Sequence, residues 1–521
     1  MSSIEIDLLT EPAGVPRARA MLQRAQWAAR SFGRYDKQSV DRIVNAVAEV
    51  AEAKAHEYAE WAVRETGFGV PDHKVIKNIA CSTGVVKTYR DHDYVTPRVD
   101  SLSKIVEVPR PAGVVLALTP STNPVATVYF NVLLCLMTRN AVVVSPHPLA
   151  REVCTDAARA LAAAAVDAGA PDGAIQVVDA PSIPLIDALM TSERTNVIIA
   201  TGGGAVVHAA YSSGTPAIGV GPSNVPVFVD ETADLGKAAQ RIIDSKSFDN
   251  SILCTNESVL IVVESVAERL LRELKRAGAH LLTTEESEQI RALLFPEGKF
   301  DVRCVGKSAA WLATEAGIRV DGNTRVLLAP FDLIVPEEVL AHEKLCPVLG
   351  FVRVDSRRRG IDAASALLRI TGAGHSAVIH STDPQTIMEY GAAVPALRVV
   401  VNVGNSLGSA GIETNLAPSM TIGTGFYGHS SLTENLQPKH LVQWTRIAYN
   451  AAEGEVFGNF SGLVPWEHSL GLVPPYPTAS NQLPAGDSAG EYVVAPSASS
   501  QDLRQEIRRL IVEELKNIVK G

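Results

Sequence analysis

The residues from Gly113 to Ser145 read GVVLALTPSTNPVATVYFNVLLCLMTRNAVVVS, and this stretch decides the fold class. Two runs rich in valine, at 113–118 and 141–145, predict short buried strands. Between them, a polar turn at 119–124 leads into an apolar segment at 125–137 that predicts a buried helix. A strand, a helix and a second strand in this order predict a unit with parallel strands, so the expected fold class is α/β.

The same region must also be considered as a membrane segment, because no charged residue occurs from Pro111 to Thr138. Its 28 positions would be enough for a helix to cross a bilayer. Prolines and amides interrupt it, however, and in lipid they would leave polar groups without partners: Pro120, Asn123, Pro124 and Asn131. We therefore expect a soluble protein without a membrane partner.

Further runs rich in valine and isoleucine extend the pattern along the chain. They are IQVVD (175–179), NVIIAT (196–201), VPVFV (225–229), SVLIVV (258–263) and runs near 326–329 and 399–403. Amphipathic helices are expected within residues 15–64, and further helices separate the strands. Continuous apolar strands separated by helices predict doubly wound parallel sheets that are covered on both faces.

The composition limits the classes of function. The chain has 521 residues, with 47 Lys and Arg against 57 Asp and Glu, and a formal net charge of −10. This acidic balance disfavours a nucleic-acid partner, because phosphate backbones require clustered basic side chains. Nothing at residues 1–10 reads as a secretory signal, so we expect a cytoplasmic protein whose six cysteines are reduced thiols.

The last part of the sequence has a different composition. Small residues and proline dominate 478–500, which predicts a flexible linker. Residues 501–521 predict an amphipathic helix whose apolar stripe consists of Leu503, Ile507, Leu510, Ile511, Leu515 and Ile518. Such a helix has no core of its own. It either docks back on its own chain or a sister subunit, or binds a groove on another protein, and the residues alone leave both open.

Two polar positions are candidates for chemistry. Asn123 lies in the turn after the first strand, where α/β sheets place active-site groups, and its amide could stabilise an oxyanion. The alternative is that it caps the following helix. Cys254 ends SFDNSILC (247–254) after a polar loop, where a thiolate nucleophile could form. A buried structural thiol is the alternative there.

The glycine cluster ATGGGAVV (200–207) follows a strand and precedes a helix, which is the geometry of a phosphate site at a helix N-terminus. It departs from the G-x-G-x-x-G fingerprint, because Val207 occupies the last glycine position, and a tight turn is the alternative. The histidines lack metal-binding spacings such as H-E-x-x-H, so we expect no metal site.

Taken together, several segments resemble the aldehyde dehydrogenase superfamily, and within it the branch that acylates coenzyme A (CoA). They span about residues 20–448 in collinear order and are ETGFG (65–69), TPSTNP (119–124), TRNAVVVSPHP (138–148), ATGGGAVVHAAYSSGTPAIGVGPSNVP (200–226), SFDNSILC (247–254), AHEKLCPVLG (341–350) and SSLTENLQPKHL (430–441). The aldehyde dehydrogenase half of bifunctional aldehyde–alcohol dehydrogenases is among the relatives that the set suggests.

The resemblance implies roles for individual residues. Cys254 aligns with the catalytic nucleophile, Asn123 with the side chain that stabilises the oxyanion, and Glu343 with the glutamate that holds the nicotinamide ribose. The other implied cofactor-binding positions are Thr119, Ser145, His147, Thr201, Gly202 and Gly203. The family implies NAD as cofactor. NADP is not excluded, because Pro148 stands where a glutamate commonly holds the ribose 2′-hydroxyl.

The resemblance also implies a domain organisation and a homodimer or homotetramer. A Rossmann-type cofactor domain is expected at 1–228, with 98–110 in a small β oligomerisation element, and an α/β catalytic domain at 229–430. Residues 431–477 are expected to return to the cofactor domain and the oligomerisation element. The linker at 478–500 and the tethered helix at 501–521 follow.

One departure from the superfamily bears on the chemistry. Hydrolytic relatives carry a glutamate that activates water against the thioester, and here Val220 stands at that position. Because valine cannot act as a general base, the acyl-enzyme is expected to persist until a thiol such as that of CoA attacks it. Ser223 is a second departure, at a position where relatives often have glycine, and Cys346 has no assigned role.

The implied function is an oxidoreductase that converts a short-chain aldehyde, CoA and NAD⁺ to an acyl-CoA and NADH through a cysteine thioester. The linker and final helix resemble the device with which such enzymes enter bacterial microcompartments, so 501–521 is a candidate encapsulation peptide for shell or cargo proteins, and the microcompartment lumen is the expected location. The alternatives are a reductive semialdehyde dehydrogenase acting on an acyl-phosphate or acyl-CoA, and a non-catalytic scaffold. The sequence does not distinguish acetaldehyde, propionaldehyde, lactaldehyde and sulfoacetaldehyde as substrates.

Overall fold

A five-stranded parallel sheet forms around the βαβ unit that begins at Gly113. In spatial order its strands are β5 (Ile175–Val177), β4 (Ala141–Ser145), β3 (Val114–Leu118), β6 (Val197–Ala200) and β7 (Ala217–Gly219). The computed structural model describes residues 12–466 and residue 476. Helix α6 (Pro124–Met137) connects β3 to β4 and is buried along its whole length, as expected for a helix that is apolar on every side.

The register of this sheet brings three strand ends together. Leu118 at the end of β3 pairs with Ser145 of β4 on one side and with Ala200 of β6 on the other. The turns that follow these strands therefore start at the same edge, where open α/β sheets bind ligands.

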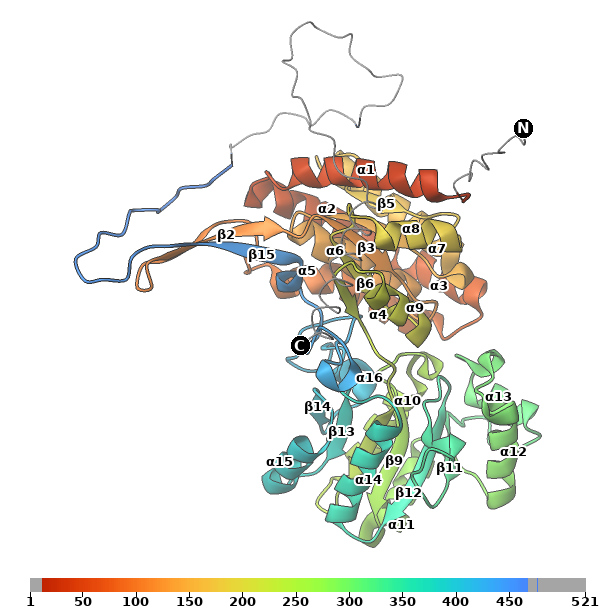
Figure 1. Cartoon of the computed structure of the whole chain (residues 1–521). Coiled ribbons are helices and arrows are strands. Elements are labelled where there is room, and N and C mark those ends of the chain that lie inside the picture. Colours follow the sequence, from red (N-terminus) through yellow and green to blue (C-terminus); the bar gives the residue numbers. More distant parts are fainter. Residues whose placement is uncertain (1–11, 467–475, 477–521) are drawn as a thin grey trace, which may run out of the picture. The chain divides into compact units, whose positions relative to one another are not determined.

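Helices from the first part of the chain and from the strand connections surround the five-stranded sheet, in the red to yellow part of Figure 1. They are α1 (Val15–Phe32), α2 (Lys37–Ala53), α3 (Ala55–Thr66), α4 (Pro71–Ile79), α5 (Val85–Tyr89), α7 (Arg151–Asp167), α8 (Ile183–Thr191) and α9 (Gly204–Ser212). The amphipathic pattern at 40–53 is confirmed in α2, where Asp36 caps the first turn by accepting a hydrogen bond from the Ser39 amide at 2.8 Å.

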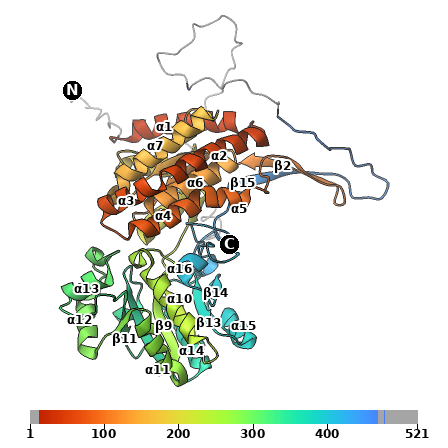
Figure 2. The same cartoon turned by 180° about the vertical axis from the view of Figure 1, so that it is seen from behind.

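A seven-stranded parallel sheet follows. Its strands in spatial order are β10 (Ala279–Leu281), β11 (Val326–Pro330), β12 (Val348–Val354), β9 (Glu257–Val263), β8 (Val225–Val229), β13 (Ala377–His380) and β14 (Val399–Val401). Its helices are α10 (Leu235–Ser247), α11 (Glu264–Arg276), α12 (Thr284–Leu294), α13 (Ala309–Glu315), α14 (Arg357–Ile370), α15 (Pro384–Ala393) and α16 (Asn405–Gly408). Figure 2 shows these green and cyan elements gathered around their own sheet, and the predicted α/β fold is confirmed.

A small antiparallel sheet consists of β1 (Arg98–Asp100), β2 (Ile105–Pro111) and β15 (Val442–Ala448). Strands β2 and β15 pair over seven residues and run side by side in Figures 1 and 2. This sheet contains the segment 98–110 that was expected to form a small β element. The chain thus returns at 442–448 to a strand that lies more than 300 positions earlier.

The expected domain division stays a prediction. The boundary after residue 228 falls within β8, which belongs to the seven-stranded sheet. Leu432, Leu436 and Leu441 join the hydrophobic core of the five-stranded sheet. The linker at 478–500 and the helix at 501–521 lie outside the described residues. Within the part of the chain that the structure describes, no helix combines the length and apolarity required to cross a bilayer.

Candidate active site

Cys254 lies just before β9, in the middle of the seven-stranded sheet. It follows a short 3₁₀ turn, η3 (Phe248–Ser251), and its side chain is half-buried. All six cysteines belong to the described part of the chain, and the other five are buried. Cys254 is therefore the one cysteine with partial access for a substrate, which favours the nucleophile over the structural thiol.

The electrostatic surroundings keep the Cys254 thiol protonated in the free protein. Burial raises the pKa of this thiol to about 12, and the neighbouring carboxylate of Glu343 contributes to the rise. The positive charges of Arg398 and Lys77 act in the opposite direction. The nucleophilic thiolate is thus a minor species at neutral pH, and any group that adds positive charge or removes the charge of Glu343 increases its population.

The loop before Cys254 has an unusual backbone. Asp249, Asn250 and Ser251 have φ angles of 49°, 51° and 62°, in the left-handed region that residues other than glycine rarely adopt. Hydrogen bonds hold this conformation: the Val70 amide donates to Asp249 Oδ1 at 2.6 Å, and the Asp249 amide donates to His73 Nδ1 at 2.8 Å. Helix α4 and the residue preceding it therefore fix the path of the chain that leads to the cysteine.

Asn123 occupies the N-cap position of α6, but its side chain does not cap the helix. Its Oδ1 accepts a hydrogen bond from Lys77 Nζ at 2.6 Å, and its Nδ2 makes only a long contact of 3.4 Å to Thr122 Oγ1. The capping alternative for the side chain is thus wrong. The geometry leaves the amide nitrogen as a donor for another group, which is what an oxyanion site requires.

Glu343 is half-buried in the loop before β12, and its carboxylate has one close hydrogen-bond donor. Ser223 Oγ donates to Glu343 Oε1 at 2.5 Å. Burial raises the pKa of Glu343 to about 7, and the Ser223 hydrogen bond and the charges of Lys246 and Lys344 limit this rise. Ser223, which replaces the glycine of many relatives, therefore orients the glutamate expected to bind the ribose.

The expected cofactor residues meet at the shared edge of β3, β4 and β6. The Thr119 amide donates to the Ser145 carbonyl at 3.0 Å, and the Thr201 amide donates to the Leu118 carbonyl at 3.1 Å. Ser145 is buried, and the buried Thr119 Oγ1 has no hydrogen-bond partner within the described structure. These three positions thus lie together at one edge of the sheet, and their role in cofactor binding stays a prediction.

The glycine turn opens helix α9. Gly203 is its N-cap residue, and nothing lies within 4 Å of where a Cβ atom at Gly203 or Gly204 would stand. This open space at the N-terminus of a helix fits a dinucleotide phosphate. His147 is exposed, and its Nδ1 accepts a hydrogen bond from the Leu149 amide at 3.2 Å.

Val220 lies one residue beyond β7, and its side chain is buried. Its amide donates to the Ala200 carbonyl at 3.3 Å, so the residue belongs to the same edge of the five-stranded sheet. An apolar side chain at this point provides no base to activate water.

The role of one buried charge near the site, that of Arg398, could not be predicted from sequence. Arg398 is buried, and its guanidinium donates to the Gly374 carbonyl at 2.8 Å and to the His375 carbonyl at 2.9 Å. Its positive charge favours the Cys254 thiolate. The imidazole of His375 is also buried, its Nε2 has no partner in the described structure, and burial lowers its pKa to about 3. Because Arg398 lies more than 100 positions after Cys254, the sequence does not show that it comes near the cysteine.

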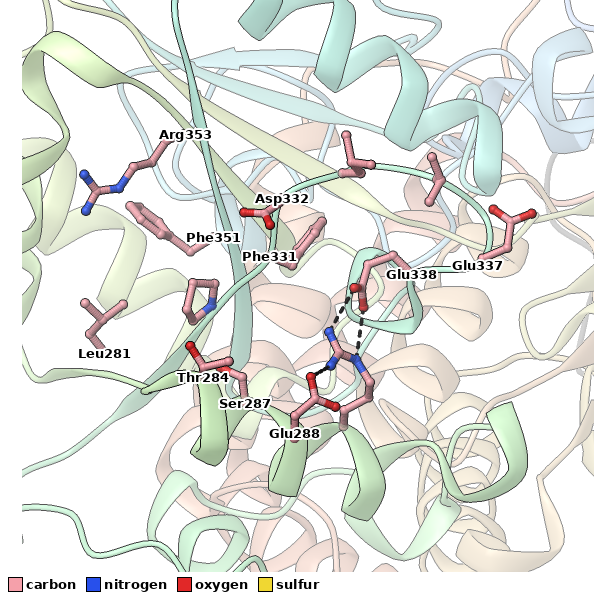
Figure 3. A pocket seen from close by; sticks show the side chains of 14 residues that line it. Leu281, Thr284, Ser287, Glu288, Phe331, Asp332, Glu337, Glu338, Phe351 and Arg353 are labelled. Carbon is pink, nitrogen blue, oxygen red and sulfur yellow. Dashed lines mark hydrogen bonds and ion pairs between the residues drawn. The ribbon is translucent and has the colours of Figure 1, made fainter.

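A separate cavity of about 790 Å³ lies at the other end of the seven-stranded sheet, beyond the carboxyl ends of β10 and β11 (Figure 3). Phe331 and Phe351 line it, and Arg291 of α12 forms ion pairs with Glu338 and Glu288 at its side. None of the site residues expected from sequence lines this cavity. In the described residues, no cluster of three or more potential metal ligands occurs.

Comparison with known proteins identifies the family. The profile of the aldehyde dehydrogenase family matches residues 10–292. The chain belongs to the aldehyde dehydrogenase family. It is 35% identical over 444 residues to the bifunctional aldehyde-alcohol dehydrogenase AdhE of Escherichia coli (strain K12), which covers 84% of this chain but 50% of that protein. The chain thus spans about half the length of this curated relative.

A second curated relative matches over nearly its full length. Succinate-semialdehyde dehydrogenase (acetylating) of Clostridium kluyveri is 35% identical over 440 residues, covering 84% of this chain and 97% of that protein. This relative is named as an acetylating enzyme, and AdhE as a bifunctional aldehyde-alcohol dehydrogenase, so the resemblance inferred from the sequence motifs is confirmed.

Solved structures of acylating enzymes share the fold. An acetylating aldehyde dehydrogenase from Geobacillus thermoglucosidasius has a TM-score of 0.83 at 37% identity, covering 85% of this chain and 98% of that one. A propionaldehyde dehydrogenase from Rhodopseudomonas palustris, solved with bound CoA and an acylated cysteine, has a TM-score of 0.75 at 29% identity and covers 83% and 97%. A propionaldehyde dehydrogenase of the Clostridium phytofermentans fucose utilisation microcompartment has a TM-score of 0.75 at 28% identity, with coverages of 83% and 97%.

Proposed function

We propose that this chain is a CoA-acylating aldehyde dehydrogenase, which converts a short-chain aldehyde, CoA and NAD⁺ to an acyl-CoA, NADH and a proton. Two observations together support the proposal: Cys254 is the half-buried cysteine among buried ones, and a buried Val220 stands in place of a water-activating glutamate. The relative with bound CoA and an acylated cysteine supports the same chemistry.

In this proposal Cys254 attacks the aldehyde carbonyl and forms a C–S bond. The carbonyl oxygen becomes an oxyanion, which accepts hydrogen bonds from Asn123 Nδ2 and the Cys254 backbone amide. A bound nicotinamide supplies the acceptor for the hydride that leaves the former aldehyde carbon. The C–S bond remains, so the product on the protein is an acyl thioester of Cys254.

The second half of the reaction transfers the acyl group. The CoA thiolate attacks the thioester carbonyl, Asn123 again stabilises the oxyanion, and the Cys254 thiolate leaves. Because Val220 cannot deprotonate water, we expect the thioester to persist until the CoA thiolate, a stronger nucleophile than water, attacks it. Oxidation and acyl transfer are thereby separated into two steps.

The cofactor residues have distinct tasks in this scheme. We assign Glu343 to the nicotinamide ribose, Thr201, Gly202 and Gly203 to the dinucleotide phosphates, and Ser145, His147 and Thr119 to the remaining contacts along the sheet edge. The hydrogen bond from Ser223 holds the Glu343 carboxylate in a fixed orientation. At Pro148 there is no carboxylate to repel a ribose 2′-phosphate, so both NAD and NADP fit the site.

Trapping of the acyl-enzyme tests the proposal. Acetaldehyde and NAD⁺ without CoA should add one acyl group to the intact protein, and peptide mapping should place it on Cys254. Addition of CoA should remove the group and yield acetyl-CoA. Cys254→Ala should neither acquire the group nor form NADH, and a Cys254→Ala protein that retains aldehyde-dependent NADH formation would refute the assignment.

We also propose that the chain forms a homodimer or homotetramer through the antiparallel sheet of β1, β2 and β15. Ile447 and Tyr449, at and just after β15, and Val99 of β1 are exposed hydrophobic residues, and burial in a partner would remove them from water. Light scattering of the purified protein measures the mass. A monomer at micromolar concentration would contradict this assembly.

We propose finally that residues 478–521 direct the chain to a bacterial microcompartment, with 501–521 binding a shell or cargo protein. The small-residue linker followed by an apolar helical stripe supports this, as does the likeness to a microcompartment enzyme. A fluorescent protein carrying residues 478–521 should form foci in cells with assembled shells. A fusion in which Leu510 and Ile511 are changed to Asp is the control, and diffuse signal from the unchanged fusion would contradict the proposal.

A further inference from the structure

A buried cluster of two lysines and one aspartate connects the Cys254 loop to Asn123. Lys74 and Lys77 come from α4, and Asp249 comes from η3. Their side chains are 4%, 1% and 0% exposed. Asp249 Oδ2 accepts hydrogen bonds from Lys77 Nζ and, at 3.1 Å, from Lys74 Nζ. The cluster has two positive charges and one negative charge, so it leaves a net positive charge in the protein interior.

Lys77 determines which way the Asn123 amide faces. An ammonium group can only donate hydrogen bonds, so the atom of Asn123 that lies 2.6 Å from Lys77 Nζ must be the oxygen. The amide nitrogen then faces away from Lys77. In the absence of this contact the two ends of an amide differ little in shape, and the oxygen could take the place of the donor.

The surroundings of Lys77 offer few other partners. The cavity lined by Lys74, Lys77 and Asn123 measures about 10 Å³, which is the space of about one water molecule. The ammonium of Lys77 is therefore held by Asp249 and Asn123 rather than by bulk solvent. Burial alone would raise the pKa of Asp249, but Lys77 and Lys74 hold it below its usual value, so the aspartate stays ionised as an anchor for both lysines.

Asp249 also belongs to the loop that presents the nucleophile. It is the first of the three residues with left-handed backbone, and Cys254 follows five positions later. The same carboxylate thus accepts a hydrogen bond from the Val70 amide and fixes Lys77 against Asn123. One side chain connects the position of the sulfur with the orientation of the oxyanion donor.

We propose that Lys77, anchored by Asp249, is a positioning residue that holds Asn123 Nδ2 toward the reacting carbonyl oxygen and places a buried positive charge beside it. This inference rests on the proposed function for Asn123. Lys74 shares the anchor but reaches the Thr122 carbonyl at 3.3 Å instead of Asn123. Lys74 is thus the matched control within the same cluster.

The test compares Lys77→Met with Lys74→Met, each of which leaves one lysine paired with Asp249. Loss of an oxyanion donor lowers kcat by about a hundredfold or more, so Lys77→Met should lower kcat at least about tenfold with KM for the aldehyde nearly unchanged. Lys74→Met should stay within about threefold of wild type. In an Asn123→Ala background, Lys77→Met should lower kcat by a smaller factor than it does in wild type, because the part of its effect that acts through Asn123 is already lost and only its charge effect on the thiolate remains.

Independent effects of Lys77→Met and Asn123→Ala, or equal kcat losses for the two methionine variants, would overturn the inference. If Lys77→Met does not fold, Lys77→Gln takes its place in the same comparison. Alkylation of Cys254 by iodoacetamide gives a readout that does not need turnover. Because the Lys77 charge favours the thiolate, alkylation should slow by about threefold or more in Lys77→Met and remain unchanged in Lys74→Met.

The alkylation result separates the two proposals. An inactive wild-type protein that still shows this difference would reject the proposed function and keep the electrostatic role of Lys77. An active wild-type protein in which both variants are alkylated at the wild-type rate would reject the inference and keep the function.

Discussion

At the residue scale, the proposed nucleophile Cys254 is protonated in the free protein, and nearby charges determine how readily its thiol loses the proton. Cys254 lies between the carboxylate of Glu343, which opposes thiolate formation, and the cations Arg398 and Lys77, which favour it. Ligands that neutralise or displace Glu343 would therefore activate the cysteine. Such an arrangement limits reaction of the thiol with other electrophiles before cofactor and aldehyde are bound.

The pH dependence of Cys254 alkylation should show that the thiol is protonated in the free protein. With a pKa of about 12, the thiolate fraction rises about tenfold per pH unit between pH 7 and 9, and the rate of alkylation by iodoacetamide should follow it without a plateau. Mass spectrometry of the Cys254 peptide measures the rate in the absence of ligands. A plateau reached below pH 8 would mean that the thiolate is already stabilised in the free protein.

Glu343 should make stability depend on pH. Its pKa is raised from 4.5 to about 7, so the folded protein binds a proton more tightly than the unfolded chain. Stability therefore decreases as pH rises between these two values, and the loss is complete above about pH 7. Glu343→Gln removes the titration, so its Tm should exceed that of wild type more at pH 8 than at pH 5.

The control for this measurement is Glu337→Gln, at an exposed glutamate in the same loop. Its Tm should stay close to that of wild type, because the side chain is exposed. If Glu343→Gln behaves in the same way as Glu337→Gln, the carboxyl of Glu343 is not destabilised by burial.

Family motifs in the sequence allowed roles to be predicted for individual residues. Contacts between residues far apart in the sequence follow no motif and could not be predicted. Cys254, Asn123 and Glu343 lie in recognisable motifs, and the structure places a donor or a charge beside each of them. The partnership of Lys77 with Asp249 spans 172 positions and follows no motif. Ser223 was likewise read only as a departure from glycine, because its bond to Glu343 crosses 120 positions.

At the element scale, the strands were predictable because each is a short run of buried aliphatic residues. The runs at 113–118, 141–145 and 225–229 correspond to β3, β4 and β8 with shifts of at most one residue. The order of strands within each sheet was not predictable, because pairing depends on contacts between distant segments. The antiparallel pair of β2 and β15 is the clearest case.

The loop from η3 to Cys254 depends on a glycine in a neighbouring turn. Gly69 has a φ of +81°, and a Cβ atom there would lie 2.1 Å from Asp249 Oδ1. Gly69→Ala should therefore push Asp249 away from Lys77, destabilise the protein by about 2 kcal/mol or more and lower kcat. Gly322→Ala is the control, since nothing lies within 4 Å of its Cβ position. Equal Tm and kcat for the two variants would contradict the close packing of this loop.

At the scale of the whole molecule, the residues proposed for catalysis all lie within the part of the chain that the structure describes, well before residue 476. A chain that ends at residue 476 should therefore keep kcat within about twofold of the full-length protein, since no proposed catalytic contact is lost. Steady-state assays of both chains with the same aldehyde provide the comparison. A large loss of kcat would show that the tail contributes to the active site.

In the proposed reaction the acyl group leaves Cys254 to a thiol and not to water. The direct measurement is NADH formation from acetaldehyde and NAD⁺ at known enzyme concentration, first without CoA and then after its addition. Without CoA, about one NADH per active site is expected, followed by sustained turnover and acetyl-CoA once CoA is present. Continuous NADH production with accumulation of free acetate in the absence of CoA would contradict it.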